Sequence, residues 1–273
     1  MNKIHNLFLP VLILISTSIS ADTLKLATTT STENSGLLNK IIPIFENNSG
    51  HKVHVIAVGT GKALRMGEDG DADVLLVHSR KAEDQFIADG HGVNHRSVMY
   101  NDFVIVGPKN DPANIQGERD SSAALKKIFD TQNIFISRGD NSGTHKKERT
   151  LWIIAGVNPT GKWYREAGQG MGKVLQITNE LSAYTLTDRG TWLSNQSHSR
   201  LKVLVEGDER LFNPYGIIAV NPNKYPDIKY TAAMSFITWI TSPQTQQHIA
   251  NYRINNKTLF IPMAIKTSQL IKK

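Results

Sequence analysis

Val98-Met99-Tyr100-Asn101-Asp102-Phe103-Val104-Ile105-Val106-Gly107 is a long extended stretch, and prolines break the chain soon after it. A second such stretch, Tyr215-Gly216-Ile217-Ile218-Ala219-Val220, lies between two prolines. Both are rich in β-branched and apolar residues, which favour buried strands. Because the two stretches bracket a middle block, we expect the chain to cross to a second lobe near Tyr100–Val106 and to return near Phe212–Ile218.

Strands and helices alternate on both sides of the first crossover. The strands expected from their apolar and β-branched runs are Thr23–Ala27, His51–Val58, Asp73–Val77, Asn133–Ser137, Tyr184–Thr187 and Leu201–Val205. The helices expected from their apolar periodicity are Leu37–Ser49, Lys62–Glu68, Lys81–Ala88, Ser121–Phe129, Ser142–Ala155, Gly172–Leu181 and Ala232–Tyr252, the last interrupted at Ser242-Pro243. Such alternation predicts a mostly parallel sheet with helices on both faces.

The sequence thus predicts an α/β protein of two lobes, each a mostly parallel sheet with helices on both faces. Two crossover strands would form the hinge. Lobe 1 would be discontinuous, comprising residues 22–104 and 213–273, and lobe 2 would comprise residues 105–212. In this architecture the ligand lies between the lobes.

Residues 1–21 have the pattern of a secretory signal peptide. Lys3 makes the start basic, Leu7–Ile15 is a short apolar run, and small residues lead to a cleavage site after Ser20 or Ala21. The apolar run is too short to span a bilayer as a helix. With no cysteine for a lipid anchor, we expect a periplasmic, unlipidated and monomeric protein once the signal peptide is cleaved.

The formal net charge is +7, and a basic balance suits an anionic ligand. The densest basic stretch, Lys146–Arg149, is interrupted by an acidic residue, so we do not expect nucleic acid as a partner. The absence of cysteine excludes disulfides, thiolate nucleophiles and cysteine-ligated metals. The histidines are scattered, and no calcium loop, nucleotide loop or hydrolase elbow is complete. We therefore expect no catalysis, no metal and no cofactor.

Hydroxyl residues fill the first junction between strand and helix, Thr28-Thr29-Thr30-Ser31-Thr32. Such residues cap helices. They also surround the unpaired N–H groups of the first helical turn, which favour a small anion. Five hydroxyls exceed what capping requires, although an ordinary cap in a polar loop remains the alternative.

A second junction, Ser137–His145, has the sequence Ser-Arg-Gly-Asp-Asn-Ser-Gly-Thr-His. Arg138 offers a planar fork of donors that fits an oxyanion in bidentate fashion. Ser142 and Thr144 would supply hydroxyls and first-turn N–H groups. Asp140 can either hold Arg138 in position or accept a proton from a protonated anion. The alternative is a turn with an aspartate cap.

Two further junctions are candidates of the same kind. Gly59-Thr60-Gly61 opens a predicted helix but lacks the third glycine of a dinucleotide loop. Ser182–Gly190 could place a hydroxyl or Arg189 at the ligand. Arginine in this setting is more often a surface ion-pair partner, and this is the interpretation we favour for Arg189.

These segments together resemble the tungstate-binding proteins of Tup-type ABC importers. The resemblance is carried by Leu26–Thr32, Ser35–Leu38, Val58–Leu64, Asp71–Ser79, Tyr100–Pro108, Ser137–Thr144 and Leu181–Gly190. It covers nearly all of the mature chain, and it implies the type II periplasmic-binding-protein fold and a membrane permease as partner. It also implies ligand contacts from Thr29, Thr30, Arg138 and Thr144, and further contacts from Ser31, Thr60, Ser142, Ala183 (through its backbone) and Thr185.

The choice of anion depends on Asp140. Arg138–Thr144 also resembles phosphate-binding proteins, whereas the Thr-Thr-Thr-Ser segment is more specific to tungstate binders. Near neutral pH tungstate and molybdate are unprotonated dianions, while phosphate usually carries a proton. A site made only of donors rejects the protonated ion. If Asp140 is locked onto Arg138 the site is donor-only, and if it faces the ligand it admits phosphate. We expect tungstate, with molybdate and phosphate as alternatives.

Two functions of other classes remain open. An enzyme acting on phosphate esters could use the same cleft, although the sequence offers no evident metal set or nucleophile–base pair. A sensory or adhesive protein could reuse the fold and bind partners through its basic surface.

Overall fold

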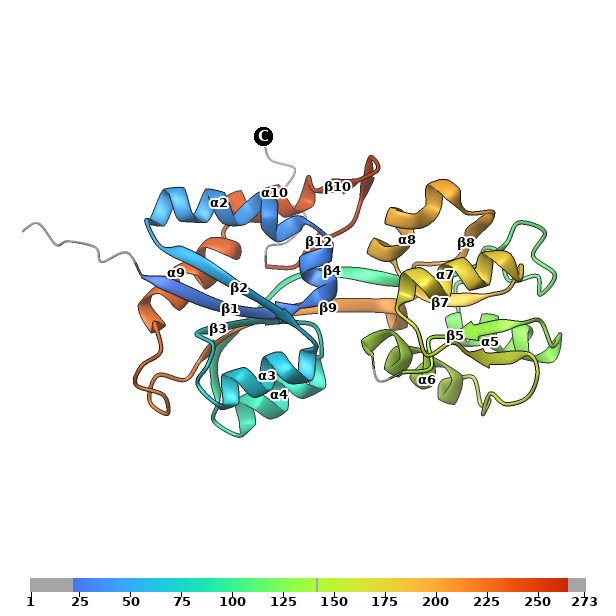
Figure 1. Cartoon of the computed structure of the whole chain (residues 1–273), viewed down its shortest axis with the longest axis horizontal. Coiled ribbons are helices and arrows are strands. Elements are labelled where there is room, and N and C mark those ends of the chain that lie inside the picture. The colour runs from blue at the N-terminus through green and yellow to red at the C-terminus, as the bar shows by residue number, and fades with distance from the viewer. Residues whose placement is uncertain (1–21, 141, 265–273) are drawn as a thin grey trace, which may run out of the picture.

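The computed structural model describes residues 22–140 and 142–264, and two groups of elements are joined in it by two long strands (Figure 1). These strands are β4 (Gly92–Pro108) and β9 (Phe212–Val220). They pair antiparallel with each other from Gly92 to Asp102 of β4. The two crossover segments predicted from the sequence therefore lie side by side and connect what we call lobe 1 and lobe 2.

Lobe 1 contains a sheet in the order β2-β1-β3-β9-β4-β12. Its other strands are β1 (Thr23–Thr29), β2 (Lys52–Val58), β3 (Val74–Val77) and β12 (Ile261–Pro262). Its helices are α1 (Thr30–Asn34), α2 (Leu37–Ser49), α3 (Thr60–Glu68), α4 (Arg80–Ala88), α9 (Tyr230–Ile240) and α10 (Pro243–Ala250). Helices α2, α9 and α10 lie on one side of the sheet and α3 and α4 on the other (Figure 1).

Lobe 2 is built around the far end of β4. Its strands β7 (Thr185–Asp188) and β8 (Leu201–Val205) pair antiparallel with β4, while β5 (Phe135–Ser137) and β6 (Tyr164–Glu166) pair parallel with each other. Its helices are α5 (Ser121–Asp130), α6 (Gly143–Ile154), α7 (Met171–Glu180) and α8 (Arg189–Asn195). Short elements complete the fold: 3-10 turns η1 (Gln196–His198) and η2 (Glu209–Leu211), and the hairpin of β10 (Arg253–Ile254) and β11 (Lys257–Thr258).

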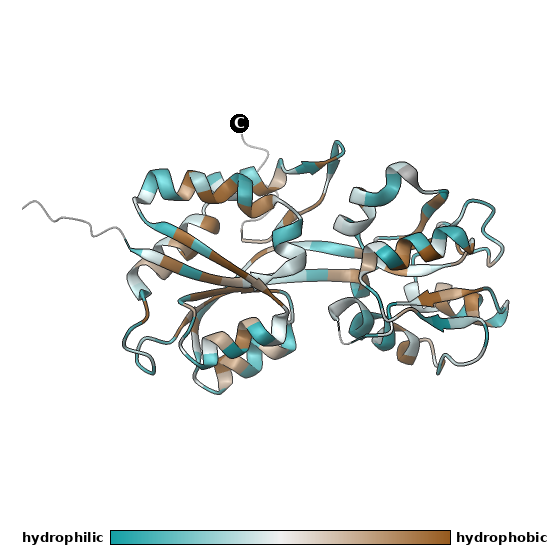
Figure 2. Ribbon diagram, viewed as in Figure 1, coloured by the Kyte–Doolittle hydropathy of each residue, from teal (hydrophilic) through white to brown (hydrophobic). Residues whose placement is uncertain are grey.

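Apolar side chains of the central strands fill both faces of the lobe 1 sheet. Leu24 and Leu26 of β1 pack with Phe45 of α2 in one cluster, and Ala27 packs with Phe86 of α4 in another. Alternate residues of a strand point to opposite faces, so one strand serves both clusters. The apolar residues accordingly concentrate on the strands and on the inner sides of the helices (Figure 2). This core fixes the ends of the strands, where the site residues lie.

The sheet of lobe 1 is mixed, which corrects the expectation of a mostly parallel one. β1 runs parallel to β2 and β3, whereas β9 runs antiparallel to both β3 and β4. The physical reason is the path of the chain. A chain that leaves a lobe on one strand and returns on its neighbour must run the two strands in opposite directions.

The junction Thr28–Thr32 contains no separate loop, which corrects the polar loop considered for it from the sequence. Thr28 and Thr29 belong to β1, and helix α1 starts at Thr30. The Thr28 hydroxyl donates to the carbonyl of Leu76 at 2.7 Å, so its polar group is satisfied inside the sheet while its β-branched side chain suits a strand. The long C-terminal helix, by contrast, is interrupted as predicted, since Ser242 caps α10 with its hydroxyl.

The predicted signal peptide, residues 1–21, lies outside the described residues. In the part of the chain that the structure describes, no helix has both the length and the apolar character needed to cross a bilayer.

Candidate anion-binding site

The first half of the site lies where β1 passes into α1. Thr29 is the N-cap of α1, and its hydroxyl accepts the N–H of Thr32 at 3.3 Å. The same oxygen lies 2.7 Å from the Thr32 hydroxyl and 3.0 Å from that of Ser31. Thr30 and Ser31 are exposed, whereas Thr29 is buried. The hydroxyl cluster predicted at this junction is therefore present, with Thr29 at its centre.

The next parallel strand brings Thr60 to the same edge of the sheet. The register pairs Thr29 of β1 with Val58 of β2, and α3 begins two residues later at Thr60. Its N-cap is Gly59, which makes no side-chain capping bond. A β-carbon on Gly59 or Gly61 would have no neighbour within 4 Å. Because Gly59 and Gly61 have no side chains and the space beside them is open, a ligand could approach the first-turn N–H groups of α3 there.

His78 follows β3 and joins the hydroxyl cluster. Its Nε2 lies 3.1 Å from the hydroxyl of Thr29 and 3.4 Å from that of Ser31. Its Nδ1 lies 3.1 Å from Oδ1 of Asn213 on β9, and Asn213 donates through Nδ2 to Oδ1 of Asn101 on β4 at 2.8 Å. This second bond assigns Oδ1 of Asn213 as an acceptor. The neutral ring of His78 therefore donates through Nδ1 and accepts through Nε2.

The surroundings of His78 favour its neutral form. Desolvation lowers the pKa of its imidazole, and the bond to Asn213 and the carboxylates of Glu83 and Asp188 only partly oppose this effect. A neutral imidazole beside Thr29 is an acceptor for a hydroxyl proton. His78 thus ties the hydroxyl cluster of α1 to both crossover strands.

The second half of the site is the start of α6 in lobe 2. Nε of Arg138 donates to Oδ2 of Asp140 at 2.8 Å, and Oδ1 of Asp140 accepts the N–H of Ser142 at 2.9 Å. Burial raises the pKa of Asp140, but the hydroxyl and N–H of Ser142 and the Arg138 guanidinium lower it more, so it is ionised. Both oxygens of Asp140 are thus engaged by donors of the same loop. This is the locked arrangement that leaves Arg138 and the helix start as donors.

Ser142 and Thr144 occupy the first turn of α6. The Ser142 hydroxyl accepts the N–H of His145 at 3.2 Å as an N-cap, and Thr144 is buried. In residues 22–140 and 142–264, neither Nη1 nor Nη2 of Arg138 makes a hydrogen bond. An anion in this loop would therefore meet guanidinium and hydroxyl donors together.

The buried carboxyl group of Glu148 stabilises the loop that carries Arg138. Glu148 accepts the Ser137 hydroxyl at 2.9 Å, the Tyr164 hydroxyl at 2.7 Å and the Trp152 indole N–H at 3.2 Å. Burial raises the pKa of Glu148 to about 7, although these donors oppose the shift. The Ser137 hydroxyl also accepts the N–H of Gly139 at 3.2 Å. Glu148 thus anchors the turn that carries Arg138.

The two halves face each other at His78. A β-carbon placed on Gly143, the first residue of α6, would lie 3.8 Å from Cε1 of His78. Gly143 belongs to lobe 2, whereas His78 follows a strand of lobe 1. The two hydroxyl-rich junctions singled out from the sequence therefore meet across the two lobes, with His78 between them.

Three other predicted residues lie outside this hydrogen-bonded cluster. The N–H of Ala183 donates to the carbonyl of Thr178 at 2.9 Å, and the Thr185 hydroxyl donates to the carbonyl of Ile136 at 2.7 Å. Contacts from these two groups to a ligand would require those bonds to be exchanged. Arg189 forms ion pairs with Asp102 and Glu206. The predicted ion pairing is confirmed, but the Arg189 side chain is only 20% exposed and so lies mostly below the surface.

Sequence reasoning missed His78 and its partners Asn101 and Asn213. A signal was present, because His78 directly follows the apolar run Val74–Val77. Ligands of open α/β sheets bind beyond the carboxyl ends of the strands, so a polar residue at that position is a candidate. The asparagines offered no such signal, since only the pairing of β4 with β9 brings them together.

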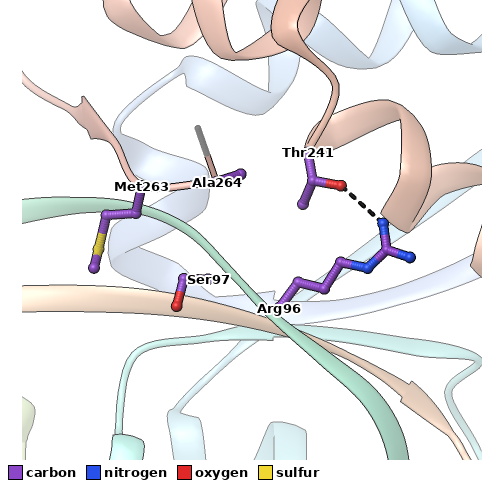
Figure 3. Close-up of a pocket in the computed structure, with 5 residues that line it drawn as sticks. All are labelled: Arg96, Ser97, Thr241, Met263 and Ala264. Atoms are coloured by element: carbon purple, nitrogen blue, oxygen red, sulfur yellow. Dashed lines mark hydrogen bonds between the residues drawn. The ribbon is translucent and has the colours of Figure 1, made fainter. Parts of the chain in front are cut away.

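A separate cavity shares none of these residues. It has a volume of ≈ 340 Å³ and is lined by Arg96, Ser97, Thr241, Met263 and Ala264 (Figure 3). Arg96 donates to the Thr241 hydroxyl at 3.1 Å across it. It lies between β4 and the end of α9 and takes no part in the hydroxyl cluster.

Two lobes on paired crossover strands, with helix starts and hydroxyls facing each other between them, define a two-lobed binding protein. The comparison with family models agrees, because residues 16–244 match the PBP superfamily domain. The type II periplasmic-binding-protein architecture expected from the sequence is thereby confirmed.

Curated and solved relatives define the family more narrowly. The chain is 50% identical over 245 residues to the tungstate-binding protein TupA of Peptoclostridium acidaminophilum, covering 88% of this chain and 86% of that one. The structure of TupA from Desulfovibrio alaskensis G20 matches with a TM-score of 0.85 and 45% identity, over 90% of this chain and 100% of that one. That of the tungstate ABC transporter protein from Geobacter sulfurreducens matches with a TM-score of 0.75 and 55% identity, over 84% and 98%. The chain belongs to the TupA family of tungstate-binding proteins.

Proposed function

We propose that this protein is the solute-binding component of an ABC importer and captures tungstate between its two lobes. The relatives named above are tungstate-binding proteins or components of tungstate transporters. In this proposal the protein binds and releases the anion without catalysis, works as a monomer in the periplasm and delivers the anion to a membrane permease.

The locked position of Asp140 is the observation that supports this choice of anion. Its two oxygens accept from Arg138 and from the N–H of Ser142, so the carboxylate is held toward donors of its own loop and is not aimed at the ligand as an acceptor. A donor-only loop favours an unprotonated dianion over phosphate, which carries a proton near neutral pH. Molybdate has the same charge and shape and remains the second candidate ligand.

The contacts we propose are those of the two facing helix starts. Thr29, Thr30, Ser31 and Thr60 would bind the anion from lobe 1, and Arg138, Ser142 and Thr144 from lobe 2. Asp140 would orient Arg138. Ala183 and Thr185 would join only if lobe closure exchanged their present bonds. The hinge would lie in β4 and β9, with lobe 1 comprising 22–104 and 213–273 and lobe 2 comprising 105–212.

Replacing Arg138 tests the site. Arg138→Ala should weaken tungstate binding at least about 100-fold, because two charge-assisted hydrogen bonds to a desolvated dianion are lost. Titration calorimetry of the chain without residues 1–21 would measure tungstate, molybdate, phosphate and sulfate in turn. The matched control is Arg96→Ala, which removes an arginine of the separate cavity and should leave the affinity unchanged.

Two results would contradict the proposal. If Arg138→Ala kept the wild-type affinity for tungstate, the site would be misplaced. If the wild-type protein bound phosphate and not tungstate, the choice of anion would be wrong, and Asp140 would be a ligand contact.

A further inference from the structure

His78 accepts a hydroxyl proton at the centre of a site otherwise built from donors. Its Nε2 lies 3.1 Å from the Thr29 hydroxyl and 3.4 Å from the Ser31 hydroxyl, while its Nδ1 is held by Asn213. In the locked loop of lobe 2 both oxygens of Asp140 already accept hydrogen bonds. His78 thus directs an acceptor nitrogen at two of the hydroxyls that would bind the anion.

A hydroxyl has one proton and cannot donate it to two acceptors at once. When the hydroxyls of Thr29 and Ser31 both turn their protons toward an anion, Nε2 of His78 loses its donors. A desolvated acceptor without a partner costs roughly 1–3 kcal/mol. A proton taken from solvent onto Nε2 removes that cost, because the nitrogen then becomes a donor to Thr29, Ser31 or the anion itself.

We propose that His78 takes up one proton when a fully deprotonated dianion binds, and thereby sets the pH dependence of capture. This inference rests on the proposed function. The bond to Asn213 through Nδ1 is compatible with both states, since Nδ1 carries a proton in the neutral tautomer and in the imidazolium. One positive charge on the ring would then offset one of the two negative charges of the anion.

The groups that face His78 allow this charge. Glu83 on α4 and Asp188 at the end of β7 place carboxylates near enough to favour the imidazolium. Tyr215 on β9 packs against the ring, with centroids 4.8 Å apart, and Gly143 of α6 faces Cε1. The hydroxyls of Thr29, the N-cap of α1, and of Ser31 in α1 accept as readily as they donate. Without an anion, desolvation keeps the ring neutral, so the proton arrives with the ligand.

Proton uptake can be measured directly. Titration of the wild-type protein with tungstate at about pH 7.5, in several buffers of different ionisation enthalpy, should show about one proton taken up per anion. As pH rises between the pKa of His78 in the free protein and its pKa in the complex, the affinity for tungstate should fall about tenfold per pH unit. The same uptake is expected with molybdate, which is also a dianion.

His78→Gln isolates the source of the proton. Glutamine can still accept from Thr29 but does not titrate, so proton uptake should drop to near zero and the affinity should no longer vary with pH. His54→Gln is the matched control, because His54 is exposed on β2, and it should take up the wild-type number of protons. His78→Asn, which can still donate to Asn213, serves as a second variant if His78→Gln does not fold.

The wild-type protein provides an independent measurement. With ¹⁵N-labelled histidine, the ring nitrogens of His78 should shift from the neutral to the imidazolium pattern when tungstate is added. Tight tungstate binding with no proton uptake and no shift would overturn the inference and leave the proposed function intact. Uptake that persists in His78→Gln would assign the proton to another group, such as Glu148. Absence of tungstate binding by the wild-type protein would instead overturn the proposed function.

Discussion

Single residues in this protein carry chemistry that their sequence neighbours do not reveal. Glu148 lies in the densest basic stretch of the chain, yet it points inward and accepts three hydrogen bonds while its pKa rises to about 7. Asp140, by contrast, stays ionised beside Arg138. Two carboxyl groups of one loop and helix thus differ in protonation near neutral pH because one is buried and the other is paired with a cation.

Glu148 should make the stability of the protein depend on pH. Its carboxyl holds a proton below about pH 7 in the folded state but only below about pH 4.5 in the unfolded state. The folded state binds more protons between these values, so stability falls as pH rises through this window and levels off above it. The full effect is about 3 kcal/mol, at roughly 1.4 kcal/mol per pKa unit.

Glu148→Gln tests this expectation. Glutamine can accept from Tyr164 and donate to Ser137, and it carries no charge at any pH. At pH values above 7, urea unfolding should show the variant to be more stable than wild type by about 1–3 kcal/mol. Below the unfolded-state pKa the two proteins should agree. If the two proteins differed in stability by the same amount above pH 7 and below the unfolded-state pKa, the difference would come from packing and not from ionisation of Glu148.

At the scale of elements, the starts of helices determine the site. Helix α6 begins at Gly143, with Ser142 as its cap, and this start faces His78 of the other lobe. A side chain at this position would have ordinary contact with the ring in the present conformation. Any approach of the two lobes would shorten that contact. The absence of a side chain at Gly143 therefore suits closure around a small anion.

Gly143→Ala should weaken binding without harming the fold. Alanine is accepted at the start of a helix, so stability should change by no more than about 0.5 kcal/mol. The added methyl group should cost about 1–3 kcal/mol of binding free energy through overpacking, which is roughly tenfold to hundredfold in Kd. Calorimetry and urea unfolding would measure the two effects separately.

Gly172→Ala is the matched control, since Gly172 lies in the first turn of α7 in the same lobe. A β-carbon there would approach nothing closer than the Asn195 side chain at 4.0 Å. The Gly172→Ala variant should bind tungstate with the wild-type affinity. Unchanged affinity in Gly143→Ala would show that the lobes do not close over this position.

At the scale of the whole molecule, β4 and β9 connect the two halves of the site. Asn213 of β9 holds His78, and Asn101 of β4 holds Asn213. A displacement of either strand would therefore move His78 relative to the hydroxyl of Thr29. Binding between the lobes should accordingly be coupled to their relative position.

Tungstate should stabilise and compact the whole chain. At a free concentration about 1,000 times Kd, binding adds about 4 kcal/mol to the free energy of unfolding. For a protein of this size that corresponds to a rise in Tm of roughly 8–16 °C. Solution scattering should show a smaller radius of gyration with tungstate than without it. At the same tungstate concentration, Arg138→Ala with about 100-fold weaker binding should keep only about 1.4 kcal/mol of this stabilisation. In the wild-type protein, a rise in Tm at constant radius of gyration would indicate binding without closure.

The sequence predicted the two crossover strands, most of the other strands and the two junctions that meet at the site, but not β6 or the short strands β10, β11 and β12. Apolar periodicity, prolines and clusters of hydroxyls are local properties, so they can be read along the chain. The limits of α1 were not predicted, because a threonine-rich segment suits a loop, a strand or a helix cap equally well, and only the pairing of Thr28 with β3 decides between them.

The tertiary structure alone decided the remaining features. The antiparallel course of β9, the bond between His78 and the Thr29 hydroxyl, the engagement of Asp140 by Arg138 and the burial of Glu148 each join residues far apart in sequence or depend on side-chain direction. Such contacts form when the core brings strand ends together, and their energies depend on burial and distance. Neither burial nor distance can be read from the sequence near a residue. The sequence therefore indicated which segments carry the candidate site, but not which side chains contact one another there.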